Sequence, residues 1–165
     1  MKEITLSQSK VAIVDDRDYD ELSKVNWCAS RIRNCYYAVR TSSRKDGKHN
    51  ILMHRVIWEM HNGPIPKGFE IDHINGNGLD NRLENLRLCT SSQNHINQHT
   101  ARPHSSNFKG VRYHTGTRKW AAAVTYERKR YYIGLFTSEI EAARAYDAKV
   151  KELCREYAKL NFPGE

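Results

Sequence analysis

The stretch at residues 70–97 limits the possible folds of this chain more than any other part of it. It reads EIDHINGNGLDNRLENLRLCTSSQNHIN and holds one Asp-His pair, Asp72 and His73, together with six asparagines. It has too little continuous apolar sequence for an ordinary core element. Its turn formers and short apolar runs instead predict a β-β-α unit. The expected parts are a strand at 69–71, a loop at 74–85, a returning strand at 86–90 and a helix that Ser91 or Ser92 caps.

This unit offers the groups that phosphodiester hydrolysis needs. Asp72, and Asn94 on the expected helix, provide a carboxylate and an amide oxygen, which suit Mg²⁺ and leave most coordination positions to water and phosphate. His73 is substantially neutral at pH 7 and could take a proton from the attacking water. Neighbouring side chains of a regular strand point to opposite faces, so Asp72 and His73 can serve one phosphate only if the strand ends or bulges there, or if the metal lies at the edge of the strand.

Asn85, twelve residues after His73, starts the returning strand and either fixes the orientation of the imidazole or pins the loop. The asparagines of the loop also have a purely structural interpretation, because each is a turn former and an Asx-rich loop needs no catalytic role. The joint pattern favours catalysis. It consists of the Asp-His pair, Asn85 and then Asn94 nine residues later, all within one β-β-α unit.

This pattern resembles the HNH endonucleases, the ββα-metal nucleases found among phage and intron-encoded homing enzymes. The resemblance covers EIDHINGNGLDNRLENLRLCTSSQN, and the upstream MHRVIWEMHNGPIP looks like the helix that often precedes the motif. It implies that Asp72 and Asn94 bind a divalent metal, that His73 is the general base and that Asn85 orients His73. Asn94 stands where many members of the family have His. The zinc-binding C-x-x-C pairs of some relatives are absent, so no structural zinc is expected.

Upstream of the motif, residues 1–50 are expected to form a β-rich N-terminal region and residues 51–100 the nuclease unit. The expected elements are strands at 4–6 and 11–14, a helix at 18–25 opened by Asp18, a hairpin at 26–33 and 35–41, and a helix at 51–61 ended by Gly63. Six basic residues either coat a solvated hairpin surface or form a phosphate-contacting arm: Arg31, Arg33, Arg40, Arg44, Lys45 and Lys48. His54, beside Arg55, is either partly buried, solvent-facing or a phosphate contact.

A polar linker at 101–106 precedes the last expected domain, residues 107–165. Its pattern predicts a three-stranded antiparallel sheet packed on one helix, with strands at 108–114, 119–127 and 129–136. A capping box of Ser138 and Glu141 should open the helix, which runs to about Leu153. The sheet face away from the core has a centre of small residues with Arg and Tyr around it, so it can approach a DNA groove closely. It carries Gly110, Arg112, His114, Ala121, Ala123, Thr125, Arg130, Tyr132 and Gly134.

This segment resembles the AP2/ERF DNA-binding domain of plant transcription factors, which also occurs fused to HNH nucleases. The matching residues are FKGVR, KWAAAV, YYIGLF, EAARAYD and the closing LNFP, over roughly positions 107 to 163. The resemblance implies that five residues face DNA, namely Lys109, Arg112, Thr125, Arg130 and Tyr132. Thr125 and Tyr132 stand where Arg and Trp are usual in the plant domains.

The charge balance agrees with a nucleic-acid partner. The chain of 165 residues has 27 Lys and Arg against 19 Asp and Glu, a net charge of +8, and residues 101–165 carry +6 of it. No apolar run is long enough to span a membrane, and MKEITLSQSK has no signal-peptide core, so we expect a cytoplasmic protein with no membrane partner, in a bacterial or phage-infected cell by the resemblance. The four cysteines are expected to be free thiols, although Cys89, His95 and His99 offer a minority zinc alternative.

Together these features predict an α+β protein: a β-rich N-terminal region, a ββα-metal HNH unit and an AP2/ERF-like domain. The expected function is a metal-dependent, homing-type DNA endonuclease that acts as a monomer on double-stranded DNA. The alternative is a non-catalytic DNA-binding regulator that retains a degenerate HNH scaffold. If the last domain supplies affinity, a fragment of residues 1–100 should still cleave DNA but should bind it weakly.

Overall fold

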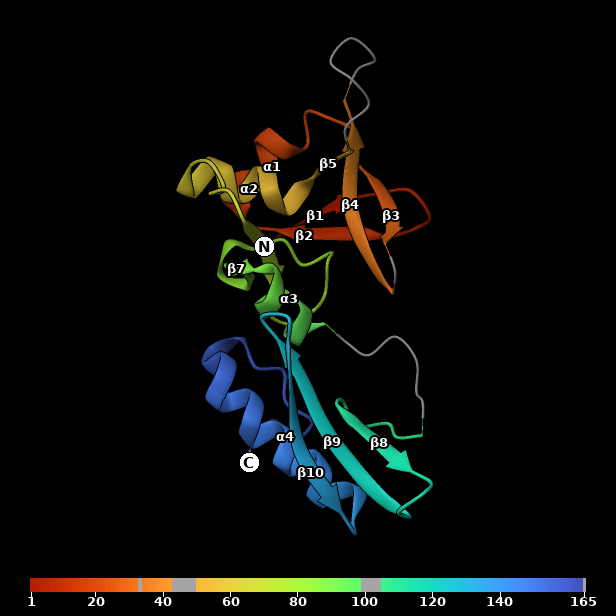
Figure 1. Cartoon of the computed structure of the whole chain (residues 1–165). Coiled ribbons are helices and arrows are strands. Elements are labelled where there is room, and N and C mark those ends of the chain that lie inside the picture. The colour runs from red at the N-terminus through yellow and green to blue at the C-terminus, as the bar shows by residue number, and fades with distance from the viewer. Residues whose placement is uncertain (33, 43–49, 99–104, 165) are drawn as a thin grey trace. The chain divides into compact units, whose positions relative to one another are not determined.

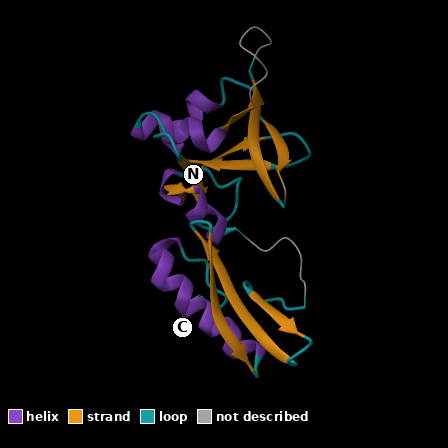
Figure 2. Cartoon of the chain, in the orientation of Figure 1, coloured by secondary structure: helices purple, strands orange, loops and turns teal. Residues whose placement is uncertain are grey.

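The computed structural model describes residues 1–32, 34–42, 50–98 and 105–164, and the chain forms two compact units, Met1–Cys89 and Thr90–Glu165. Both units contain helices and strands, so the expected α+β class is confirmed (Figures 1 and 2). Among the residues described, no helix has the length and apolar character needed to cross a membrane. Four basic residues of the expected hairpin arm, Arg33, Arg44, Lys45 and Lys48, lie outside the described residues, as do positions 101–104 of the expected linker.

The first unit is built from short strands and two helices in chain order. These elements are β1 Lys2–Thr5, β2 Val11–Val14, α1 Asp16–Leu22, β3 Cys28–Ile32, β4 Cys35–Thr41, β5 Asn50–Leu52, α2 Met53–Asn62, β6 Phe69–His73, the 3₁₀ turn η2 Leu83–Asn85, and β7 Leu86–Thr90, whose last residue already belongs to the second unit. β1 pairs antiparallel with β2, the antiparallel order β3-β4-β5 forms a second sheet, and β6 pairs with β7. The N-terminal strands therefore lie in one unit with β6, the loop that follows it and nearly all of β7, while the helix of the nuclease motif does not.

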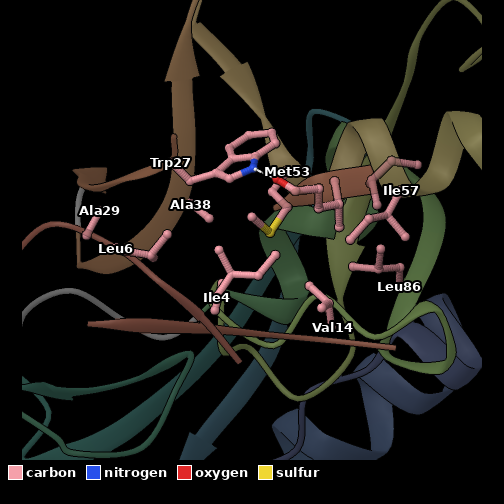
Figure 3. Packing of buried hydrophobic residues seen from close by; sticks show 12 residues of the cluster. Ile4, Leu6, Val14, Trp27, Ala29, Ala38, Met53, Ile57 and Leu86 are labelled. Atoms are coloured by element: carbon pink, nitrogen blue, oxygen red, sulfur yellow. Dashed lines mark hydrogen bonds between the residues drawn. The ribbon is translucent and has the colours of Figure 1, made fainter. Parts of the chain in front are cut away.

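One apolar core joins the N-terminal strands to the nuclease motif (Figure 3). It contains Val14 from β2, Ile57 from α2 and Leu86 from β7, all of them buried. The Trp27 indole lies in the same cluster and donates a hydrogen bond to the Leu22 carbonyl at 2.9 Å. Since side chains from residues 4 to 86 share this core, the first 50 residues are part of the scaffold that carries the motif.

The starts of α1 and α2 differ from the sequence prediction. Helix α1 begins at Asp16, and Asp18, expected to open it, is 1% exposed inside it, with Oδ1 2.7 Å from His61 Nε2. Helix α2 begins at Met53 because residues 50–52 extend the β3-β4 hairpin as a third strand. Gly63 ends α2 as expected, in the left-handed conformation that glycine adopts without strain (φ +78°).

The second unit holds a short helix, a three-stranded antiparallel sheet in the order β10-β9-β8 and a long helix packed on that sheet (Figure 1). The elements are α3 Ser91–Asn97, β8 Val111–His114, β9 Lys119–Tyr126, β10 Lys129–Phe136, α4 Glu139–Cys154 and the 3₁₀ turn η3 Arg155–Tyr157. Gly110 lets the chain pass close to α4, because a Cβ there would lie 2.0 Å from the Tyr146 ring. Ser138 is the N-cap of α4, but its side chain makes no capping hydrogen bond, so the expected capping box with Glu141 is not formed.

Candidate nuclease site

Asp72 and His73 lie at the end of β6, and both are buried, with 7% and 4% of their surfaces exposed. The strand stops at His73 because the chain turns there, and the Gly76 amide donates to the His73 carbonyl at 2.9 Å. The two neighbouring side chains have different partners, as the alternation of a strand requires: Arg87 for Asp72 and Asn81 for His73.

The Asp72 carboxylate is paired with Arg87 of β7. Arg87 Nε and Nη2 both donate to Asp72 Oδ2, at 3.1 Å and 2.9 Å. The guanidinium offsets the charge of a carboxylate that is almost wholly removed from water. The sequence analysis did not identify Arg87 as the partner of Asp72. A signal was available, because Arg87 belongs to the returning strand, which was expected to pair with the strand before Asp72.

Asp72 fits a hard divalent cation in its donor chemistry. A carboxylate offers about four lone-pair positions over its two oxygens, so the two bonds from Arg87 to Oδ2 do not exhaust its capacity. Within the described residues there is no cluster of three or more His, Cys, Asp or Glu side chains that could hold an ion.

The His73 imidazole is enclosed by side chains from three other elements. Its ring centroid lies 4.9 Å from that of His54 on α2, in an edge-to-face arrangement, and 5.8 Å from that of Tyr37 on β4. Its Nε2 lies 3.4 Å from Oδ1 of Asn81, in the loop between β6 and β7. Of the environments that the sequence allows for His54, the structure shows burial: the side chain is 5% exposed and packs on His73.

Burial keeps both imidazoles neutral near pH 7. Loss of water lowers the pKa of His73 below its ordinary value, while the Asn81 hydrogen bond and the charges of Asp72 and Asp80 oppose that shift. Burial lowers the pKa of His54 to about 3, with smaller contributions from His73 and Arg55. A neutral His73 has a lone pair with which to accept a proton, as a general base must.

Asn85 pins the loop between β6 and β7. The Oδ1 atom of Asn85 accepts a hydrogen bond from the backbone N–H of Asn75 at 3.0 Å. Its Nδ2 atom donates to Asn75 Oδ1 at 3.1 Å and to the backbone carbonyl of Asp80 at 2.7 Å. Of the two roles considered for Asn85, these contacts support the loop anchor rather than a direct bond to the imidazole. Asp80 is itself held by Arg82, which donates to both carboxylate oxygens at 2.8 Å and keeps the pKa of Asp80 below its usual range.

Asn94 lies on α3, which belongs to the second unit. Thr90 caps this helix rather than Ser91 or Ser92. The Thr90 hydroxyl accepts a hydrogen bond from the backbone N–H of Gln93. The side-chain oxygen of Gln93 accepts one from the backbone N–H of Thr90. The structure therefore brings Asp72, His73 and Asn85 together in the first unit, while the role of Asn94 as a metal ligand stays a prediction.

Lys109 holds the C-terminal end of α3. Its ammonium donates hydrogen bonds to the carbonyls of Ile96 and, at 2.6 Å, Gln98, and burial lowers the pKa of this lysine to about 8. A cation at the C-terminal end of a helix satisfies carbonyls that have no partner within the helix. The ammonium is thus committed within the unit, and its contacts give no support to the predicted DNA contact of Lys109.

The other four predicted DNA contacts share one exposed face of the β8-β9-β10 sheet. Arg130 lies directly opposite Thr125, Tyr132 opposite Ala123, and Arg112 opposite Ala121. Residues opposite each other, or two apart on a strand, point to the same side of a sheet, so these side chains form one surface. Arg112, Thr125 and Arg130 are exposed, and Tyr132 is 61% exposed.

Comparison with known proteins places the nuclease motif in a described family. Residues 52–96 match the model of the HNH endonucleases. The chain is 42% identical over 78 residues to Protein 3.8 of Escherichia phage T7. The aligned region covers 47% of this chain and 64% of that protein. The chain is 36% identical over 110 residues to the uncharacterized HNH endonuclease L560 of Acanthamoeba polyphaga mimivirus, covering 66% of this chain and 56% of that protein.

A further relative is the SPbeta prophage-derived putative HNH homing endonuclease YosQ of Bacillus subtilis, 36% identical over 59 residues, or 36% of this chain and 34% of that protein. The chain spans less than two thirds of the length of each of these relatives. The match at residues 52–96 covers both strands of the motif, its loop and nearly all of α3. The chain therefore contains an HNH endonuclease segment, and this part of the sequence prediction is confirmed.

Proposed function

We propose that this protein is a metal-dependent DNA endonuclease of the homing type, which hydrolyses phosphodiester bonds. The observation that carries the proposal is the buried Asp72-His73 pair at the end of β6, in an HNH segment whose loop is anchored by Asn85. In this proposal His73 is the general base, and Asp72 and Asn94 hold one divalent cation, Mg²⁺ or another.

Each residue has a distinct part in the proposed reaction. The neutral imidazole of His73 takes a proton from the attacking water, and its enclosure by Tyr37 and His54 fixes the plane of the ring. A divalent cation held by the two oxygen ligands would stabilise the charge that develops on the phosphate and on the leaving oxygen. Asn85 keeps the β6-β7 loop in place, so that His73 starts from one position.

We further propose that the second unit is an AP2/ERF-like module that binds double-stranded DNA. Arg112, Thr125, Arg130 and Tyr132 share one exposed face, with Ala121 and Ala123 between them. A face of this composition can come close to a groove and still reach base edges and phosphates. The +6 charge of residues 101–165 supports the same assignment.

A second candidate function is a DNA-binding regulator with an inactive HNH scaffold. Two observations favour it: Asp72 is already paired with Arg87, and His73 is only 4% exposed. For an active nuclease, binding of metal and DNA must open this arrangement enough for water and phosphate to reach His73. Cleavage distinguishes the two functions directly, because a regulator binds DNA and does not cut it.

Relaxation of supercoiled plasmid by the full chain tests the proposal. We expect relaxation with Mg²⁺, none with excess EDTA and none for Asp72→Ala. His73→Ala should lower the cleavage rate by about 10²- to 10⁴-fold without a matching loss of affinity for DNA. His95→Ala is the matched control, because His95 is exposed and neighbours Asn94. Normal cleavage by His73→Ala together with loss of cleavage by His95→Ala would identify a different base, and unchanged cleavage in EDTA would reject the metal assignment.

A further inference from the structure

Asn81 is a completely buried side chain whose amide group has a defined orientation. It is 0% exposed, and its Nδ2 donates to the Leu79 carbonyl at 3.1 Å. A carbonyl oxygen can only accept, so the nitrogen of the amide must face Leu79 and the oxygen must face the other way. That oxygen, Oδ1, lies 3.4 Å from Nε2 of His73.

The orientation of the Asn81 amide decides which nitrogen of His73 carries the proton. Oδ1 of Asn81 has no hydrogen to give, so Nε2 of His73 must be the donor in this contact. A neutral imidazole has one N–H, and its lone pair is then on Nδ1. We infer that Asn81 is a positioning residue that holds His73 as the Nε2–H tautomer, so that Nδ1 is the nitrogen that accepts the proton of the attacking water. This inference rests on the proposed function of His73 as a base.

Strand β2 holds Asn81 in place. The backbone N–H of Asn81 donates to the Ile13 carbonyl at 2.8 Å, and the backbone N–H of Ile13 donates to the Leu79 carbonyl at 2.8 Å. Ile13 and Asp80 form a parallel bridge at the same point. Two residues further along, the Leu83 amide donates to Asp15 Oδ2 at 2.9 Å. The N-terminal region thus fixes the loop segment whose side chain meets the imidazole, which gives this region a part in the site.

The rings around His73 keep it from turning over. A rotation of 180° about the bond from Cβ to the ring would replace Nε2 by Cε1 opposite Asn81 and remove the hydrogen bond. His54 packs edge-to-face on His73 at 4.9 Å, and Tyr37 packs at 5.8 Å. Close packing opposes such a rotation, because interior side chains have little free space around them. Asn81 therefore selects the proton position, and His54 and Tyr37 preserve the ring orientation that makes the selection effective.

Nitrogen NMR of the full chain tests this inference without DNA or metal. In the protein labelled at the histidine nitrogens and studied at pH 8, we expect a proton bonded to Nε2 of His73 and none on Nδ1. Asn81→Ala should lose the slowly exchanging Nε2 proton, because its acceptor is gone. Asn77→Ala is the matched control, since Asn77 lies in the same loop, is exposed and accepts from the Leu79 amide, and it should keep the wild-type pattern. A proton on Nδ1 in the wild-type protein would overturn the inference, whether or not the Asn81 variant folds.

Cleavage kinetics separate this inference from the proposed function. Asn81→Ala should lower kcat by about 10- to 100-fold and leave KM unchanged, a loss of the size found when the hydrogen-bond partner of a metal-binding histidine is removed. Wild-type kcat in Asn81→Ala would overturn the positioning role. If the wild-type tautomer is as expected but His73→Ala cuts at the normal rate, the proposed base is wrong while the tautomer assignment stands. If the proton is on Nδ1 and His73→Ala is inactive, the base is right and the role of Asn81 is wrong.

Discussion

Gly78 is a single residue on which the geometry of the β6-β7 loop depends. A Cβ at this position would lie 2.5 Å from the Tyr36 carbonyl oxygen and 2.8 Å from the ring of Tyr37, distances that real Cβ atoms do not reach. The Tyr37 ring is also one of the two rings that pack on His73. The absence of a side chain at Gly78 thus lets the loop and the hairpin come together beside the candidate base.

Gly78→Ala should therefore destabilise the first unit and disturb the site. We expect a loss of ~1 to 3 kcal/mol in the free energy of unfolding, the cost of adding a methyl group to a well-packed position. The measurement is denaturant unfolding followed through the NMR signal of the Trp27 indole N–H, which belongs to the core of this unit.

Gly116→Ala provides the control for the general effect of replacing glycine, because a Cβ there would meet nothing closer than 3.4 Å. It should leave the Trp27 transition unchanged. Equal stability of the Gly78 and Gly116 variants would mean that the loop can move away from Tyr36 and Tyr37 at little cost.

At the scale of residues, the sequence predicts the parts of the site that are adjacent in the chain and misses those that the fold brings in. Asp72, His73 and Asn85 follow from one contiguous pattern. Tyr37, His54 and Asn81 contact His73 from β4, α2 and the loop, and nothing in their local sequence indicates that contact. The sequence does not distinguish Asn81 from the other turn formers of the loop, and its complete burial becomes visible only in the fold.

At the scale of elements, the strands were predicted more accurately than the helices. The strands at 11–14, 35–41 and 86–90 have the bounds that their apolar alternation indicated. The starts of α1 and α3 differ from the prediction because several adjacent residues can cap a helix, and α2 starts later than predicted because residues 50–52 form β5. The sequence also gave no sign of which unit α3 joins, since its seven residues contain a single large apolar side chain, Ile96.

Helix α3 depends on the second unit for its packing. Ile96 is 2% exposed and lies in one cluster with Val124, Tyr146, Val150 and Cys154. Lys109 adds its hydrogen bonds to the end of the helix. A helix of seven residues has little stability by itself, because helices shorter than about 12 residues are marginal in water. The capping box at Thr90 alone is therefore not expected to keep α3 formed.

A fragment of residues 1–100 should accordingly retain the core of the first unit and lose α3. This revises the expectation from the sequence, because the proposed ligand Asn94 would then have no fixed position. Burying an isoleucine contributes about 1.5 to 3 kcal/mol, and the fragment loses that contribution at Ile96. We expect a native Trp27 indole signal, no protection of the α3 amides against hydrogen exchange and no Mg²⁺-dependent cleavage.

The matched control is the full chain with Ile96→Ala, which keeps the second unit and removes only the apolar contact of α3. It should show reduced but measurable protection of the α3 amides. Cleavage by the fragment at the rate of the whole chain would contradict this prediction. If the α3 amides of that fragment were also unprotected, cleavage would not require a fixed position for Asn94.

At the scale of the whole molecule, the two units differ in charge as well as in fold. Residues 101–165 carry +6 of the net charge of +8, although they are the shorter part of the chain. Phosphate contacts supply most non-specific affinity for DNA and make it depend on salt, so the second unit is expected to dominate binding. The sequence predicts this division from charge alone, and the registers of β8, β9 and β10 agree with its expectation that Arg112 and Arg130 lie on the same face.

Arg112→Ala and Arg130→Ala should each weaken binding of double-stranded DNA by ~1 to 3 kcal/mol if the side chain reads a base edge, with relaxed preference at one position of the site. If the arginine contacts phosphate, its replacement should instead weaken binding to all sequences. The slope of log K against log salt concentration should then decrease in magnitude by about one. Lys151→Ala, which removes one positive charge from α4 rather than from the sheet, is the control and should change affinity least. Binding is measured by fluorescence anisotropy in the full chain at several salt concentrations, with EDTA to prevent cleavage. Equal losses in all three variants would mean that net charge, not this face of the sheet, determines binding.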